Sequence, residues 1–491
     1  MDMMLTRRDL CRSGTALAAA GLSAPADAGR TRLADGIDSF TAQLEAARVA
    51  AKVTGASFAY WDGKQLHTAV SGMRNSVTAD PVTPDTLMHV GSITKIANTA
   101  LLMQLVDEGK IALEDPLLKH LPDFRLRDMA AAKHISCGML VNHSSGIDGS
   151  WLPEYGPDQE RIVDTIERCA TLGQLFPPGQ ETSYNNVATV ISGYLVQRLR
   201  GKSWYTLVKT MLYEPLDMRH ALVDPLEAPR FRVSVGDLTN AATGQRVQTT
   251  RPFLAASFAP AGSTQMTSAA DTVTLARALI GGGIGSNGRR ILTAASASRM
   301  MQESAAFVPI GGWGEKVGLG WMILPGGVLS HGGSGPGVRS KVYAHPASGR
   351  VAVLLTNSDK GNNLISAFLD PIVEAWTGIK VGEPSIDSQP VDPRPIDAGR
   401  YIGVYEDVAD RYAVTQDAGG LFLRTDDKFL TYDNSSTQSP PIRLESIGND
   451  SFKGRASTAA AADRLIRFIR PDGDGKMRFL SSWGRLMART D

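Results

Sequence analysis

The chain has 491 residues, of which 43% are hydrophobic and 21% are charged, and its formal net charge at pH 7 is +1. Because ordinary domains hold about 100–200 residues, we expect two folded units. The composition excludes a disordered or fibrous chain, and the balanced charge without a long run of Lys and Arg excludes a nucleic-acid-binding surface. A small neutral or zwitterionic substrate fits this balance.

Residues 1–28 are predicted to form an export signal of the twin-arginine type. Arg7 and Arg8 precede a weakly apolar run of Ala, Gly and Leu, which ends in the small-x-small cleavage site "ADA". A frayed amphipathic helix is the alternative; the run is too short and too weakly apolar to span a membrane, which takes about 20 apolar residues. The mature protein would begin near Gly29 and be periplasmic or secreted.

Residues 29–380 are predicted to form one α+β domain with strands at both ends. The stretch 55–72 predicts two strands about an Asp-Gly turn, the strongest short hairpin signal. Apolar positions between 93 and 105 repeat with a period near 3.6, which predicts a helix at 94–108 that ends before Gly109. Further elements are expected as helices at 187–200 and 269–280 and as two strands within 341–357. Strands from both ends would share one sheet, with helices packed on it.

The last part of the chain is predicted to be a separate β domain. Residues 381–398 hold four prolines and almost no apolar periodicity, so they are expected to form a stiff linker. Residues 399–491 contain short strand-like runs separated by turn clusters such as "QDAGG" and "PDGDG". This spacing predicts a small antiparallel β-barrel or sandwich.

The cysteines and histidines do not form a metal-binding pattern. The chain has no CxxC and no HExxH, and its eight histidines are scattered. No metal or cofactor is therefore predicted. Cys137 and Cys169 would remain after removal of the signal, and they are interpreted either as a disulfide or as two buried small residues.

Ser92 and Lys95 form a Ser-x-x-Lys pair at the start of the helix predicted at 94–108. A serine hydroxyl needs a base within hydrogen-bonding distance, and a spacing of three residues places both side chains on one helix face. The lysine can act as that base only if burial or a neighbouring cation lowers its pKa. The alternative is a helix-capping serine ahead of a solvent-facing lysine. The pair alone leaves both interpretations open.

Several further motifs follow in a fixed order. They are "HVGSITKIANTALLMQLVDEGK", "ISCGMLVNHSSGI", "PPGQETSYNNVATVISGYL", "LSHGGSGPG" and "AHPASGRVAVLLTN". Together they resemble the serine β-lactamase and penicillin-binding-protein superfamily over residues 35–380, in the branch of class C β-lactamases, D-aminopeptidases, D,D-peptidases and related esterases. The resemblance implies a β-lactamase-like fold, in which helices flank an antiparallel sheet beside an all-helical subdomain. Relatives also carry a lipocalin-like C-terminal β-barrel.

The resemblance implies roles for residues of the Ser-x-x-Lys and Tyr-x-Asn motifs. Ser92 would be the nucleophile and Lys95 its proton partner. Tyr184, the first residue of a Tyr-x-Asn motif, would be phenolate-like, accept the serine proton and pass it to the leaving group. Asn186 would orient the lysine and bind a substrate amide. A second Tyr-x-Asn at 432–434 lacks the preceding "PPG" and is interpreted as a chance match.

The motif that is Lys-Thr-Gly in many relatives differs in this chain. It is His331-Gly332-Gly333 here, on a strand expected to bind the substrate backbone. The backbone N–H groups of Ser334 and Ser92 would form the oxyanion hole. The histidine would be a positive or hydrogen-bonding group whose charge varies near neutral pH. The loss of the lysine and of the threonine hydroxyl disfavours a β-lactamase and resembles D-aminopeptidases more.

A loop between the Ser-x-x-Lys pair and the Tyr-x-Asn motif carries Trp151 and Tyr155. These aromatic residues are candidates for a lid over the cleft. Self-packing within the loop is the equal alternative.

The expected function is that of a serine hydrolase that forms an acyl-enzyme on Ser92. A peptidase or amidase on an unusual peptide, with D-residues or a linearised ring, is favoured over the alternative, a carboxylesterase. A β-lactamase or a penicillin-binding sensor without turnover is disfavoured. An α/β-hydrolase would need Gly-x-Ser-x-Gly, and the nearest stretch, 332–336, lacks the last glycine. The expected partner is a small molecule or short peptide, without nucleic acid or stable membrane insertion, and the C-terminal domain is a candidate site for homo-oligomer formation.

Overall fold

The computed structural model describes residues 37–150, 161–240, 243–306, 314, 316–382, 386–428, 440–455 and 464–491. The chain divides into the units 1–35 and 36–491, and every described residue belongs to the second. The export signal, the lid residues Trp151 and Tyr155, and the second Tyr-x-Asn lie outside the described residues, so these stay predictions.

The first domain is built on an antiparallel sheet. Its strands are β1 Gly55–Trp61, β2 Leu66–Asn75, β3 Asp80–Pro81, β9 Ala305–Ala306, β10 Lys316–Val317, β11 Met322–Ile323, β12 Leu329–Gly335, β13 Val338–His345 and β14 Arg350–Thr356. Within the described ranges these nine strands run in the order β3-β2-β1-β14-β13-β12-β11-β10-β9. Because β1 pairs with β14, strands from both ends of the domain meet inside one sheet, as the sequence predicted.

Smaller strands and the helices connect and cover this sheet. The short strands are β4 Met88–His89, β5 Ala221–Leu222, β6 Asp237–Thr239, β7 Arg246–Gln248 and β8 Met266–Thr267. The α-helices are α1 Ile37–Ala50, α2 Thr94–Asp107, α3 Leu117–His120, α4 Met129–Ala132, α5 Ile162–Arg168, α6 Asn186–Arg200, α7 Trp204–Val208, α8 Ala269–Ile280, α9 Ala294–Met301, α10 Gly361–Leu364 and α11 Asp370–Thr377. The helices predicted from periodicity are confirmed as α2, α6 and α8.

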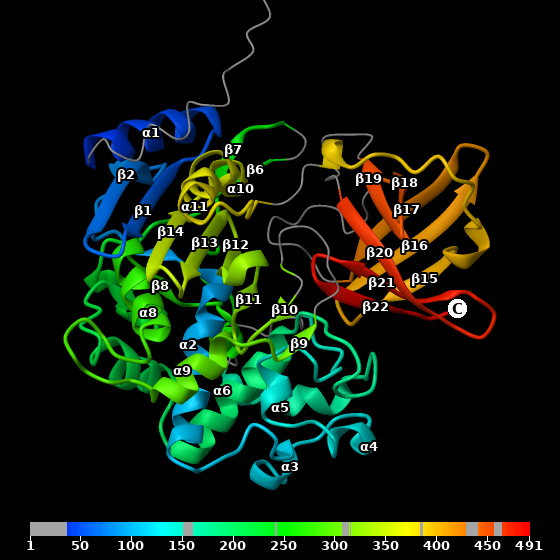
Figure 1. Ribbon diagram of the computed structural model, residues 1–491, viewed down its shortest axis with the longest axis horizontal. Coiled ribbons are helices and arrows are strands. Elements are labelled where there is room, and N and C mark those ends of the chain that lie inside the picture. Colours follow the sequence, from blue (N-terminus) through cyan, green and yellow to red (C-terminus); the bar gives the residue numbers. More distant parts are fainter. Residues whose placement is uncertain are drawn as a thin grey trace, which may run out of the picture. The chain divides into compact units, whose positions relative to one another are not determined.

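The sheet separates two hydrophobic cores because successive side chains of a strand point to opposite faces. Phe58 and Leu354 belong to one core, and Ala59 and Val353 belong to the other. Helices α1 and α11 contribute to the first core, and α8 packs on β1, β13 and β14 in the second (Figure 1). Helix α2 contacts α6, α7 and α9, and it is buried on all sides from Thr94 to Leu105.

The C-terminal strands close into a barrel in chain order. They are β15 Gly403–Glu406, β16 Asp410–Asp417, β17 Gly420–Asp427, β18 Ile442–Gly448, β19 Ser451–Arg455, β20 Arg464–Pro471, β21 Met477–Ser482 and β22 Arg485–Arg489. Alternating residues such as Tyr412 and Val414 point into its core. The closure through β15 and β22 confirms the barrel rather than the sandwich. The proposed boundaries at 29–380, 381–398 and 399–491 stay a prediction.

Two smaller predictions concern the cysteines and the membrane. Cys137 and Cys169 are both buried and free, so the disulfide interpretation is wrong and both thiols pack as small apolar groups. Across the described part of the chain, no helix combines the length and the apolar character needed to cross a membrane.

Candidate active site

Ser92 lies in the 3₁₀ turn Gly91–Ile93, directly before α2. A buried histidine, His89, fixes this turn. Its Nδ1 accepts a hydrogen bond from the Gly91 N–H at 3.0 Å, and its Nε2 lies 2.9 Å from the Ser263 carbonyl oxygen. The N-cap of α2 is Ile93, with no side-chain cap. The capping interpretation of Ser92 is therefore wrong. Its side chain instead lines a cavity of about 590 Å³.

Lys95 is drawn into the core because α2 is buried all round. The residue is 1% exposed, and its Nζ lies 3.1 Å from Ser92 Oγ and 2.7 Å from the Ala261 carbonyl oxygen. Burial, reinforced by the positive charge of Arg485, holds the pKa of Lys95 well below its usual value. The structure thus supplies the two conditions that a lysine base requires, which are contact with the nucleophile and a depressed pKa.

Tyr184 completes the group around the nucleophile. It is hydrogen-bonded with Ser92, and the centre of its ring lies 4.8 Å from Lys95 Nζ. Burial raises the pKa of Tyr184 to about 12, against the opposing effects of Ser92 and Arg485. The prediction of a phenolate-like side chain is therefore wrong: desolvation disfavours the anion more than the nearby cation favours it.

Asn186 is the first residue of α6 and lines the same cavity. Its Nδ2 donates to the Ser150 carbonyl at 2.8 Å. The neighbouring Asn185 caps the helix by accepting the Ala188 N–H at 2.8 Å, which fixes where the helix begins. The structure gives Lys95 the Ala261 carbonyl as its second partner, so orientation of the lysine by Asn186 stays a prediction.

Strand β12 packs against the nucleophile turn because glycines face each other at the contact. A Cβ on Gly333 would collide with the Val90 carbonyl oxygen, and a Cβ on Gly91 would lie 2.6 Å from the backbone nitrogen of Ser334. The strand is also tied down where Ser340 Oγ, from the adjacent β13, donates to the same Val90 carbonyl at 2.8 Å. This close approach brings the Ser334 N–H beside the turn that carries Ser92, as an oxyanion hole built from both residues requires.

His331 is buried in this strand, with 2% of its side chain exposed. Burial, together with the charge of Lys95, lowers the pKa of His331 to about 3. The prediction that its charge varies near neutral pH is therefore wrong, and the ring is neutral. The adjacent Gly332 is exposed, and its nearest neighbours would lie 3.8 Å from an added Cβ, so this position has room for a side chain.

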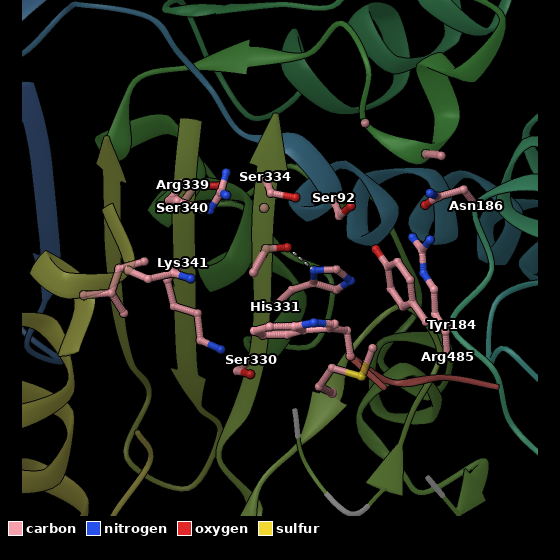
Figure 2. Close-up of a pocket in the computed structure, with 18 of the residues that line it drawn as sticks. Ser92, Tyr184, Asn186, Ser330, His331, Ser334, Arg339, Ser340, Lys341 and Arg485 are labelled. Atoms are coloured by element: carbon pink, nitrogen blue, oxygen red, sulfur yellow. Dashed lines mark hydrogen bonds between the residues drawn. The ribbon is translucent and has the colours of Figure 1, made fainter. Parts of the chain in front are cut away.

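The barrel supplies functional residues that motif analysis missed. The turn between β21 and β22 docks on the Tyr184 segment: the Tyr184 N–H donates to the Gly484 carbonyl at 2.8 Å, and the Leu486 N–H donates to Ser183 Oγ at 3.0 Å. Next to Gly484, Arg485 places its guanidinium carbon 5.5 Å from the centre of the Tyr184 ring (Figure 2). Trp483, which is exposed, was the one residue in "SSWGRL" that could have drawn attention to this turn. It does not indicate which segment of the chain the turn contacts.

His143, in the quoted "VNHSSGI" motif, is a second residue whose role was missed. Its ring centre lies 4.7 Å from that of Tyr184, and its Nδ1 accepts the Asn185 N–H at 3.2 Å. Burial and then Lys95 hold the pKa of His143 well below its usual value. A neutral imidazole therefore backs the Tyr184 ring and positions it.

Charged side chains occupy the outer walls of the cavity. Arg339 and Lys341 come from β13, whereas Asp410 and Asp427 come from the barrel, where they form a cross-strand pair. Figure 2 shows the β13 side chains on one side of His331, and Tyr184 with Arg485 on the other. No group of three or more His, Cys, Asp or Glu side chains is placed to hold a metal ion in the described part of the chain. The site therefore places a serine hydroxyl between a buried amine and a phenol.

Comparison with known proteins agrees with this chemistry. The Beta-lactamase family model matches residues 41–366. Penicillin-binding protein 4 of Amycolatopsis lactamdurans is 32% identical over 370 residues, which cover 74% of this chain and 96% of that protein. Esterase EstB of Burkholderia gladioli is 28% identical over 190 residues, 36% of this chain and 48% of the esterase. The solved structure of SurE with D-Leu matches with a TM-score of 0.71 at 26% identity, covering 92% of this chain and 99% of that one. The chain belongs to the β-lactamase family of serine hydrolases.

Proposed function

We propose that this hydrolase is a peptidase or amidase that acts through an acyl-enzyme on Ser92. The observation that carries the proposal is the buried Lys95 amine, which has a depressed pKa and lies 3.1 Å from the Oγ of Ser92, a residue that lines a cavity of about 590 Å³. This volume lies within the range of typical ligand sites, roughly 300–1,000 Å³, and suits a short peptide.

Acylation begins with proton transfer from Ser92 to the neutral Lys95 amine while Oγ attacks the scissile carbonyl carbon. The developing oxyanion accepts the backbone N–H groups of Ser92 and Ser334. The neutral Tyr184 phenol donates its proton to the leaving nitrogen as the C–N bond breaks, and the protonated lysine returns a proton to the phenolate. Water then attacks the ester, and the same groups carry its proton to Ser92.

The favoured substrate is a peptide with D-residues or a linearised ring. Support comes from SurE, whose structure was solved with D-Leu and whose chain aligns over both domains of this one. The walls of opposite charge suit a peptide with free ends. Arg339 and Lys341 would attract its terminal carboxylate, and Asp410 would attract its terminal ammonium group. A carboxylesterase is the second candidate, favoured by the similarity to esterase EstB.

A matched amide and ester with the same acyl group separates these two functions. We expect multiple turnover of both, with complete loss in Ser92→Ala. Tyr184→Phe should reduce amide hydrolysis by about 10²–10⁴-fold, the usual value of a general acid, and ester hydrolysis much less, because an alkoxide leaves more easily than an amide anion. An amide rate at background in the wild type would leave the esterase as the function.

Intact-mass analysis after a fluorophosphonate or a β-lactam tests the nucleophile itself. Labelling should be stoichiometric in the wild type and absent in Ser92→Ala. Labelling that survives the substitution would refute the assignment. A β-lactam adduct that persists without any turnover of peptide or ester would identify a penicillin-binding sensor instead.

Export by a twin-arginine-type signal in residues 1–28 belongs to the same proposal, as does assembly into a homo-oligomer through the barrel. Fractionation of cells that express the chain, with an Arg7→Lys/Arg8→Lys variant as control, tests the first. Light scattering of the full chain and of its barrel variants tests the second.

A further inference from the structure

His331 is one of eight histidines in the chain, and it lines the cavity that contains Ser92. Its side chain is 2% exposed. The ring lies among charged and titratable groups from several elements: Lys95 on α2, Lys341 on β13, and Tyr184, whose ring centre is 6.2 Å away. These neighbours influence the protonation state of the imidazole.

The hydrogen bond at Nδ1 identifies the tautomer. Nδ1 lies 2.6 Å from the Gly332 carbonyl oxygen, and a carbonyl oxygen only accepts, so Nδ1 carries the proton. Burial is the main cause of the low pKa of this ring, and Lys95 and Lys341 add to it, so a second proton is disfavoured. Nε2 is left with a lone pair and no hydrogen.

This lone pair is buried without a partner. His331 Nε2 has no hydrogen-bond partner among the residues that the structure describes. Figure 2 shows the imidazole with one nitrogen bonded to the Gly332 carbonyl and the other on the side of Tyr184. A buried acceptor left unsatisfied is unfavourable, and a ligand that donates to it removes the penalty.

We propose that His331 is a neutral hydrogen-bond acceptor that selects substrates carrying an N–H or O–H donor beside the scissile carbonyl. A carboxylate at that position meets a lone pair instead of a cation and is rejected. The residue is a specificity determinant, and it transfers no proton. The inference rests on the proposed function, because it places the acyl group of the substrate against Ser92.

The tautomer is measured without any substrate. In the full chain labelled with ¹⁵N-histidine, the ring nitrogens of His331 are assigned by their loss in His331→Gln. We expect a neutral ring with a protonated Nδ1 throughout pH 5–8. An imidazolium at pH 6, or a proton on Nε2, overturns the proposal.

The selectivity is measured with three 4-nitrobenzyl esters that differ in one substituent on the α-carbon of the acyl group. Lactate, tested as both enantiomers, carries a hydroxyl donor, isobutyrate carries a methyl group, and methylmalonate carries a carboxylate. We expect kcat/KM for one lactate enantiomer to exceed that for isobutyrate by about tenfold, which one hydrogen bond supplies. Methylmalonate should be the poorest of the three.

Variants of His331 change the ratios in predictable directions. His331→Leu, without an acceptor, should lose the lactate preference, and His331→Gln, whose amide oxygen accepts, should retain part of it. His331→Lys should invert the order in favour of methylmalonate. Equal wild-type rates for lactate and isobutyrate overturn the inference. Fluorophosphonate labelling at Ser92 is the separate test of the proposed function, because its absence in the wild type would refute the nucleophile rather than the selectivity.

Discussion

Asp148 carries a half-buried carboxylate where the hydrolase domain meets the barrel. Its Oδ1 accepts the Val408 N–H at 2.7 Å. Burial raises the pKa of Asp148 from 3.8 to about 6; the Val408 N–H opposes this shift, and the charge of Asp407 adds to it. Asp148→Asn preserves an acceptor for Val408 and removes the charge. It should therefore stabilise the fold in a pH-dependent way.

The sign follows from the two states of the chain. Below pH 3.8 the carboxyl group is protonated in both the folded and the unfolded chain, so its ionisation contributes nothing. Between pH 3.8 and 6 the unfolded chain ionises first, and above pH 6 the folded chain carries the whole penalty. A shift of about two pKa units corresponds to about 3 kcal/mol. The stability gain of Asp148→Asn should grow by up to that amount from pH 4 to pH 7.5.

Urea unfolding followed by tryptophan fluorescence at both pH values measures this change. A new amide N–H without a partner costs about 1–3 kcal/mol at either pH, so the difference between the two pH values is the quantity to compare. Asp123→Asn, at an exposed aspartate, is the matched control and should show no such difference. An identical effect of Asp148→Asn at pH 4 and pH 7.5 would show that the carboxylate is not penalised in the folded state.

Two further predictions concern the active site. Gly333→Ala should abolish hydrolysis and Ser92 labelling, because the added methyl group pushes β12 off the Val90 carbonyl, whereas Gly332→Ala, with its nearest neighbours at 3.8 Å, should retain most labelling. Equal losses would contradict the close-packing argument. Arg485→Gln removes a positive charge that lowers the pKa of Lys95, so the acidic limb of the kcat/KM profile should move to higher pH, and Arg478→Gln, on the exposed face of the barrel, should leave it in place. An unmoved limb in Arg485→Gln would exclude this electrostatic role.

Local patterns were sufficient to predict much of this molecule. The 3.6-residue period predicted α2, α6 and α8, and the ordered motifs selected Ser92, Lys95 and Tyr184, whose side chains the structure brings together. These features depend on neighbours along the chain, or on family motifs that keep their order.

Protonation states and the contribution of the barrel could not be predicted in this way. Whether Tyr184 and His331 are charged depends on burial by segments far away in sequence, and both expectations failed for that reason. Arg485 belongs to no motif and reaches the site because its two neighbours, Gly484 and Leu486, are hydrogen-bonded to Tyr184 and Ser183. Such long-range packing leaves no periodic trace in the sequence.

The docking of the β21–β22 turn on the Tyr184 segment has a consequence for the order of events in the cell. During synthesis Ser92 and Lys95 emerge before β22, which carries the cation that lowers the pKa of Lys95. A nascent chain whose first domain folds before β22 has docked therefore lacks the part of the Lys95 pKa shift that Arg485 causes. Docking of the β21–β22 turn brings this positive charge to the site, where it adds to the larger effect of burial on the pKa of Lys95.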